Sequence, residues 1–307
     1  MSRFIKKSIL FCIILSIILG YINHRYVNTE KYKSMNGAAK LLNVPNNIEI
    51  ANLGTSHGQY AFVYDELDEV GFNFAMPAQR LYYDEKILKK YINNFKEDAD
   101  LIIPISYISF YLGYDNENFE EFNKMYYPIL KAKDIKNLTL SNYLKYKALP
   151  ILTAESNIKY AFIKDNHVYE EKVEYRNYTI SEEKMEIEAK DTATRHLEFI
   201  EEERKNKEEF AKILDDIIKL SIENNINPVI TTTPFTKYYN HYFSEEFHEE
   251  FTSTINKVLE KYPDVQYLDY SHDERFLDHP EFFFDSSHLN LTGGKYFTEI
   301  ILSDLNK

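Results

Sequence analysis

The sequence predicts an α/β fold in which helices alternate with the strands of a mainly parallel sheet. Short apolar runs bounded by turn residues recur along the chain, and segments whose apolar residues have helical spacing lie between them. One run, Leu101 to Ile105 (LIIPI), is continuously apolar, which is typical of a strand buried on both faces. Strands that alternate with helices in this way favour a parallel sheet with helical crossovers.

The individual elements are predicted from their patterns. We expect strands over 48–53 (IEIANL), 101–105, 228–233 (PVITTT) and 265–269 (VQYLD), and helices over 81–95, 192–224 and 292–305. In the longest helix the apolar residues keep a period near 3.6 with charges between them, at Phe210, Ile213, Leu214, Ile217 and Leu220 or Ser221. Residues 111–190 interrupt this rhythm and are rich in Tyr, Asn, Lys and Glu. We interpret them as a partly helical insertion, with a β-hairpin near 159–178.

The amino terminus contains an apolar segment without charge, residues 8–23 (SILFCIILSIILGYIN), preceded by three basic residues. It is shorter than the roughly 20 residues that cross a bilayer core, but Phe4 and Ile5 extend it because lysine side chains can snorkel. Two interpretations fit this segment, a cleaved signal peptide and an uncleaved signal anchor.

The anchor is the interpretation that we favour, because Ile18 stands where a cleavage site before or at Gly20 needs a small residue. We therefore expect a single-pass anchor over 1–25, a stalk over 26–45 and one large domain over 46–307. The basic residues on the amino side place that end in the cytoplasm, so the large domain is expected outside the membrane.

Composition excludes several classes of protein. The net charge is −13, which repels phosphate backbones and argues against a nucleic-acid partner. A single cysteine, Cys12, can form neither an internal disulfide nor a thiolate zinc site. The histidines at 241, 248, 272 and 279 lack the pairing that metal sites show, so we predict neither a metal nor a cofactor.

Glycine is scarce, with 8 residues in the chain, and two of them bracket a serine. In the segment Asn52-Leu-Gly-Thr-Ser-His-Gly58, Ser56 follows a predicted strand and precedes a helix. A serine at that place is exposed at the carboxyl edge of the sheet and close to helix N–H groups that can hold an oxyanion. The alternative is that Ser56 only caps the helix. The neighbouring His57 is expected to point elsewhere.

A second segment near the carboxyl end reads Phe284-Asp-Ser-Ser-His-Leu-Asn290, followed by a helix with Gly293 and Gly294. A serine needs a base to become a nucleophile, and a histidine oriented by a carboxylate performs that task. Asp285 and His288, three residues apart, can meet on one tight turn. Taken alone, such a pair is also typical of turns and caps.

Together the two segments resemble the SGNH (GDSL-like) hydrolase superfamily, over residues of about 48 to 305. With the amino-terminal anchor, they are similar to its extracytoplasmic branch, which includes DltD-like and AlgJ/AlgX-like acyl-transfer proteins. The resemblance implies a three-layer α/β/α (flavodoxin-like) sandwich. It also implies that Ser56 is the nucleophile, that His288 is general base and acid, and that Asp285 orients His288.

The oxyanion donors of the family match less well. The superfamily's block Asn-x-Gly-x-x-Gly corresponds to Asn73-Phe-Ala-Met-Pro-Ala78, with alanines in place of glycines. Besides the N–H of Ser56, backbone N–H groups at Ala78 or Gln79 are candidate donors. The family's asparagine after the next strand is missing, and Ser106 is the candidate substitute; one lost donor typically costs about 10²–10³ in rate.

The resemblance implies a membrane-anchored enzyme that passes an acyl group from Ser56 to a cell-surface glycan or wall polymer, with acetyl as the leading form and D-alanyl as a variant. It further implies a multi-pass membrane acyltransferase as partner. Two alternatives use the same sequence features: an esterase or deacetylase with water as acceptor, and a non-catalytic scaffold in envelope assembly. The sequence predicts no particular oligomeric state.

Overall fold

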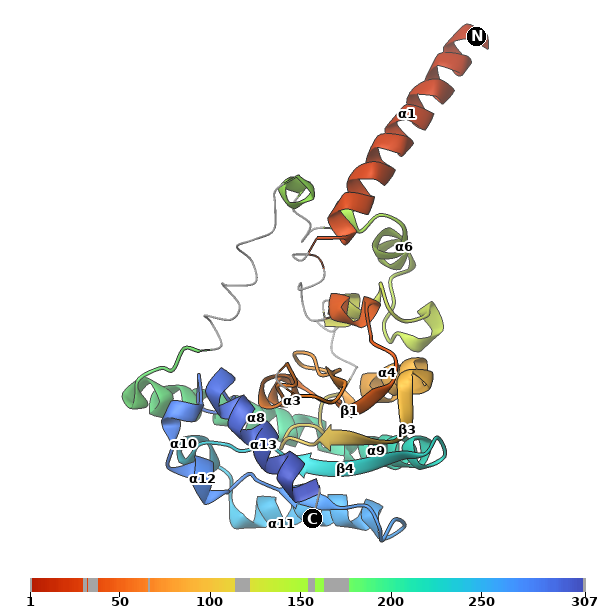
Figure 1. Ribbon diagram of the computed structural model, residues 1–307. Coiled ribbons are helices and arrows are strands. Elements are labelled where there is room, and N and C mark those ends of the chain that lie inside the picture. Colours follow the sequence, from red (N-terminus) through yellow and green to blue (C-terminus); the bar gives the residue numbers. More distant parts are fainter. Residues whose placement is uncertain are drawn as a thin grey trace. The chain divides into compact units, whose positions relative to one another are not determined.

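The computed structural model describes residues 2–29, 32, 38–65, 67–113, 122–153, 158–162 and 177–305. The chain divides into two compact units, one of residues 1–43 and 114–172 and one of residues 44–113 and 173–307 (Figure 1). The middle of the predicted insertion thus groups with the amino-terminal residues, whereas its last part belongs to the sheet unit. Most of the predicted hairpin near 159–178 and part of the predicted stalk lie outside the described residues.

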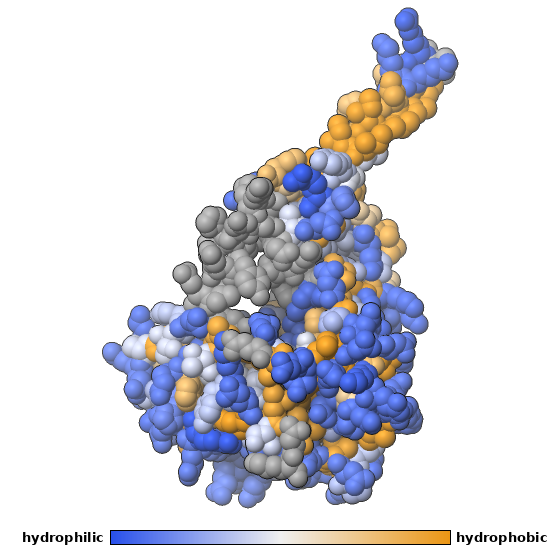
Figure 2. Space-filling model, viewed as in Figure 1, coloured by the Kyte–Doolittle hydropathy of each residue, from blue (hydrophilic) through white to orange (hydrophobic). Residues whose placement is uncertain are grey.

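The first unit begins with α1 (Ser2–Val27), which is long and apolar enough to cross a membrane and has a mean hydropathy of 2.1 in its most apolar window. The residues along this helix are hydrophobic, and those at its amino-terminal tip are hydrophilic (Figure 2). The other elements of this unit are short: η1 (Ala38–Leu42), η3 (Lys124–Tyr126), η4 (Ala132–Asp134), α6 (Leu140–Ala148), η5 (Pro150–Leu152) and η6 (Ile158–Ala161).

The last turns of α1 pack on these short elements. Tyr26 belongs to a small apolar cluster with Ile151 and Ala161. Arg25 Nε donates a hydrogen bond of 2.8 Å to the carbonyl of Ala161, and Asn23 Oδ1 accepts one of 3.1 Å from the N–H of Ile151. The carboxyl end of α1 is therefore fixed within its own unit.

The second unit contains one parallel sheet of five strands in the order β2-β1-β3-β4-β5. Its strands are β1 (Ile48–Asn52), β2 (Gly71–Asn73), β3 (Phe95–Pro104), β4 (Ile226–Thr232) and β5 (Tyr267–Asp269). The prediction of an α/β fold with a parallel sheet is confirmed, as are the four predicted strands. The sequence did not predict β2, because three residues without an apolar alternation give no periodic signal.

Helices connect these strands or follow the last one: α3 (Ser56–Ala61), α4 (Leu81–Tyr91), η2 (Ile92–Asn94), α8 (Glu182–Glu203), η7 (Arg204–Asn206), α9 (Lys207–Ile222), α10 (Lys237–Asn240), α11 (Glu245–Leu259), α12 (Glu274–Leu277), η8 (Pro280–Phe282) and α13 (Leu291–Leu305). The prediction of a single helix over 192–224 is wrong, because η7 separates α8 from α9. The break falls in a charged run, residues 201–209, that has no apolar side chain to hold a continuous helix on the core. The two helices also have different partners, α10 for α8 and both α4 and α11 for α9.

Two glycines of α13 let that helix approach its neighbours closely. A Cβ atom at Gly294 would lie 2.5 Å from the carbonyl oxygen of Tyr60 in α3, and one at Gly293 would lie 2.1 Å from the carbonyl oxygen of Phe282. Thr298 Oγ1 accepts a hydrogen bond of 3.0 Å from the N–H of Val63 just after α3. The helix that begins at Ser56 and the helix that follows His288 are thus packed against each other.

Candidate active site

Ser56 is the first residue of α3 and lies just beyond the carboxyl end of β1. The helix is capped by Thr55, whose Oγ1 accepts a hydrogen bond of 3.3 Å from the N–H of His57. Gly54 adopts a φ of +113°, a backbone conformation that side-chain-bearing residues rarely adopt. The capping role that was the alternative for Ser56 therefore belongs to Thr55, and the Ser56 hydroxyl is available for another partner.

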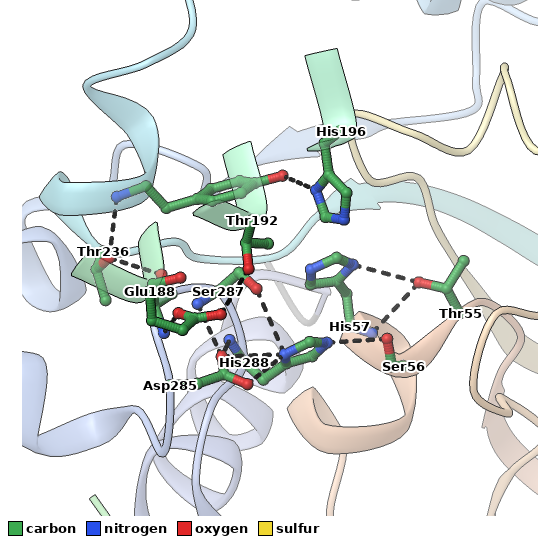
Figure 3. A network of polar contacts seen from close by, with 12 residues as sticks. Thr55, Ser56, His57, Glu188, Thr192, His196, Thr236, Asp285, Ser287 and His288 are labelled. Atoms are coloured by element: carbon green, nitrogen blue, oxygen red, sulfur yellow. Dashed lines mark hydrogen bonds and ion pairs between the residues drawn. The ribbon is translucent and has the colours of Figure 1, made fainter. Parts of the chain in front are cut away.

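That partner is His288, in the loop before α13 (Figure 3). The Nε2 atom of His288 lies 2.9 Å from Ser56 Oγ, and its Nδ1 atom lies 2.9 Å and 3.0 Å from the two carboxylate oxygens of Asp285. The side chains of His288 and Asp285 are 19% and 23% exposed. A hydroxyl, an imidazole and a carboxylate thus form one chain of hydrogen bonds that solvent reaches. Such a chain can move the serine proton onto the imidazole.

The carboxylate of Asp285 is held as an anion. Burial raises its pKa, but the imidazole of His288 and hydrogen bonds to Asp285 outweigh that effect, so its pKa lies below the ordinary range. Oδ1 accepts backbone hydrogen bonds from Ser287 at 2.9 Å and from His288 at 2.8 Å. The same turn therefore fixes the carboxylate and the backbone of the histidine that it orients.

The loop that carries Asp285 is supported by α8 and by the start of α10. Glu188 Oε2 accepts a hydrogen bond of 3.0 Å from the N–H of Ser286, and its other oxygen accepts one of 2.6 Å from Thr192. Thr236 Oγ1 donates one of 2.6 Å to the carbonyl of Ser286. Sequence reasoning missed Glu188 and Thr192, because they belong to no motif: Glu188 lies at the end of the predicted insertion and Thr192 at the start of the helix predicted over 192–224.

His57 lies in the site, contrary to the expectation that it points elsewhere. Its ring is stacked on the ring of His288, with the centroids 4.6 Å apart and the planes 11° apart. It is 4% exposed, and its Nδ1 lies 3.3 Å from Thr55 Oγ1. Burial lowers the pKa of His57 well below its ordinary value, and the charges of His288 and His196 lower it further.

His196 on α8 is a further histidine near this group. Its Nδ1 lies 2.7 Å from the hydroxyl of Tyr239. Burial lowers the pKa of His196 to about 4, together with the charges of His288 and Arg195, while Asp285 opposes the shift. Both His57 and His196 are therefore neutral at pH 7.

Two of the predicted oxyanion donors, Gln79 and Ser106, already make contacts of their own. The N–H of Gln79 donates to the carbonyl of Met76 at 3.1 Å, and the N–H of Ser106 donates to Ser109 Oγ at 2.9 Å. The hydroxyls of Ser106 and Ser109 lie 3.1 Å apart. Ala78 has a φ of +52°, which is unusual for a residue with a side chain. The N–H of Ser56 lies at the start of α3. The assignment of all four oxyanion donors stays a prediction.

The buried carboxylate of Asp84 connects the serine loop to the segment that contains Gln79. Asp84 Oδ1 accepts hydrogen bonds from the N–H of Gly54 at 2.9 Å and from Gln79 Nε2 at 2.7 Å. Burial raises the pKa of Asp84 to about 7, against the effect of both hydrogen bonds. Asp84 therefore fixes the turn that presents Ser56.

Within the described ranges of the chain, no group of three or more His, Cys, Asp or Glu residues is arranged to hold a metal ion. No family model matches the chain, and no curated protein matches it.

Proposed function

We propose that this chain is a membrane-anchored serine acyltransferase of the SGNH type. The observation that carries the proposal is the chain of hydrogen bonds from Ser56 through His288 to Asp285, in which Ser56 and His288 lie 232 positions apart in the sequence. Tight turns alone explain each segment by itself, but they do not explain why the hydroxyl and the imidazole meet at 2.9 Å.

In the proposed reaction, Ser56 Oγ attacks the carbonyl carbon of an acyl donor while its proton moves to Nε2 of His288. The tetrahedral intermediate collapses, the bond to the leaving group breaks, and His288 returns the proton to that group. An acceptor hydroxyl then loses its proton to His288 and attacks the acyl-serine. The acceptor leaves as an ester, and Ser56 regains its proton from His288. Asp285 stabilises the imidazolium in both halves.

Features of the fold support the SGNH assignment. The strand order 2-1-3-4-5 is that of flavodoxin-like doubly wound sheets, whose ligands bind beyond the carboxyl ends of the strands. Ala78 keeps a positive φ at the position where the family's block has its second glycine. The backbone at Ala78 thus has a conformation that suits glycine although the residue is alanine.

The acceptor and the location follow from the resemblance together with α1. A helix that can span a membrane suits a catalytic domain held at the outer face of the membrane, facing a surface glycan or wall polymer. The resemblance implies that a multi-pass membrane acyltransferase delivers the acyl group. Hydrolysis is the second candidate, because His288 and Asp285 are about one fifth exposed and water reaches them.

An acceptor experiment tests the proposal. The full chain in detergent micelles is given a chromogenic acetyl ester, with and without an oligosaccharide that offers free hydroxyls. A transferase releases the chromophore faster with the sugar and produces O-acetylated sugar, whereas an esterase produces acetate at a rate that the sugar does not change. Ser56→Ala abolishes either activity; equal turnover by Ser56→Ala refutes both.

A further inference from the structure

The contact between His57 and His288 has no role in the reaction described above. The two rings are nearly parallel, with a centroid separation of 4.6 Å. The ring of Phe235 packs against His57 edge-on, at 5.2 Å and 88°. Because His57 is 4% exposed, it is a buried aromatic neighbour of the expected base rather than a surface histidine.

Other rings also fix the plane of His288. Phe284 lies nearly parallel to it at 5.4 Å, and Tyr60 packs edge-on at 5.5 Å. The hydrogen bonds of an imidazole lie in its ring plane, so a tilt of His288 would turn Nε2 away from Ser56. Contacts that hold this plane therefore preserve the 2.9 Å separation between Nε2 and Oγ.

Hydrogen bonding does not explain the position of His57. Its Nδ1 has one long contact, 3.3 Å to Thr55 Oγ1. Its Nε2 is shielded from solvent and has no hydrogen-bond partner among the described residues. A positive charge on this ring would be buried, and none of the described residues that shift the pKa of His57 is a carboxylate, so the charge would be costly. The stacking of its ring on the ring of His288 is therefore the contact that explains the position of His57.

We propose that His57 is a positioning residue: its buried ring holds the plane of His288 so that Nε2 faces Ser56, and it stays uncharged while His288 takes the serine proton. This inference rests on the proposed function, because it uses His288 as the base. Two charged imidazoles in this stack would repel each other, so a neutral His57 leaves His288 free to become an imidazolium.

The charged and titratable groups around the pair agree with this division of roles. The loop before α13 contributes Asp285, which lies 2.9 Å from His288. From α8, Glu188 binds the backbone of that loop, Arg195 donates to Thr192, and His196 contacts Tyr239 of α10. His288 thus has a carboxylate partner that stabilises its charged form. His57 instead has a pKa that burial lowers, which favours its neutral form.

Three substitutions separate the ring from its nitrogens. His57→Phe keeps a flat ring without a nitrogen, His57→Gln keeps a polar group without a ring, and His57→Ala keeps neither. The readout is the rate at which a fluorophosphonate probe labels the full chain in micelles. We expect His57→Phe to stay within about 3-fold of the wild type and the other two to be slower by about 10–100-fold. His241→Ala, at an exposed histidine, is the matched control and keeps the wild-type rate.

The opposite order overturns the inference: if His57→Gln labels normally and His57→Phe does not, His57 acts through a nitrogen. The pH profile of the wild type provides a test that needs no variant. Below the optimum, the logarithm of the labelling rate should rise with a slope of one, because one imidazole loses a proton, and a slope of two contradicts a neutral His57. If the proposed function is wrong, the result differs from both of these outcomes, because the probe then does not label the wild type at any pH.

Discussion

Ser56 Oγ and His288 Nε2 lie 2.9 Å apart, although 232 positions separate the two residues along the chain. The serine is presented by a turn with a positive φ at Gly54, and the histidine by a turn that is closed by Asp285. Each turn is local, but their meeting depends on the packing of α13 on α3. Predictions about the site therefore concern both the triad and the contacts that bring its halves together.

Replacement of the carboxylate tests the orientation of His288. Asp285→Asn keeps an oxygen for the N–H groups of Ser287 and His288, so the turn should survive. Its amide N–H₂ favours the wrong tautomer of the imidazole and provides no charge for the imidazolium. We expect acetyl-ester turnover to fall by about 10³–10⁴-fold with an unchanged melting temperature. Normal turnover by this variant would exclude Asp285 from the mechanism.

The close approach of α13 and α3 predicts a steric effect at Gly294. In Gly294→Ala the new methyl group meets the carbonyl of Tyr60 and the side chain of Val63. We expect the free energy of unfolding to fall by about 1–3 kcal/mol, together with slower probe labelling, because α13 must shift. Gly20→Ala is the matched control, since nothing lies within 4 Å of the Cβ that this substitution would add. Equal stability of the two variants in urea denaturation would contradict this packing.

Support of the Asp285 loop by α8 predicts a structural role for Glu188. Glu188→Ala leaves the N–H of Ser286 without its acceptor, which should lower the free energy of unfolding by about 1–3 kcal/mol. Glu198→Ala changes an exposed glutamate of the same helix and should cost less than about 0.5 kcal/mol. Chemical denaturation compares the two. A neutral Glu188→Ala would mean that the loop holds itself without α8.

Burial of His196 predicts a pH dependence of stability. Its pKa is about 4 in the folded chain and about 6.5 when unfolded, so between these values the unfolded chain binds a proton that the folded chain does not. Stability is therefore lost as the pH falls from about 6.5 toward 4. His57 acts in the same direction and Asp84 in the opposite one, because its pKa is raised to about 7.

His196→Asn isolates the contribution of His196. Because asparagine does not titrate, the variant should lose on the order of 1–3 kcal/mol less stability than the wild type between pH 7 and pH 4.5. Urea denaturation at the two pH values measures this difference. Parallel pH dependences of the two chains would show that His196 protonates as readily in the folded state as in the unfolded one.

The sequence predicted those parts of the fold that have a periodic signal. Buried runs such as Leu101 to Ile105 identify strands without tertiary information. The short strand β2 has no such signal because three residues are too few to show an alternation. The break between α8 and α9 has none because it depends on the different elements against which the two helices pack. The hydrophobic pattern of the amino terminus likewise predicted α1.

In the site, the residues with motifs were predictable and the residues that only contact them were not. That Ser56, Asp285 and His288 lie together could be predicted from turn glycines and chemical roles. His57 was expected to point away, because the sequence does not show that α3 directs its ring onto His288. Glu188 lies in a charged helix where one glutamate resembles the next. Which glutamate meets Ser286 depends on how α8 lies on the loop.

The most direct test of the account is to map a covalent adduct on the full chain in micelles. After reaction with a fluorophosphonate probe, mass spectrometry of the digested protein should find the adduct on the peptide that contains Ser56. Ser56→Ala should acquire none while keeping the wild-type circular dichroism spectrum. A folded wild type that forms no adduct, or an adduct that persists in Ser56→Ala, would contradict the assignment of Ser56 as the nucleophile.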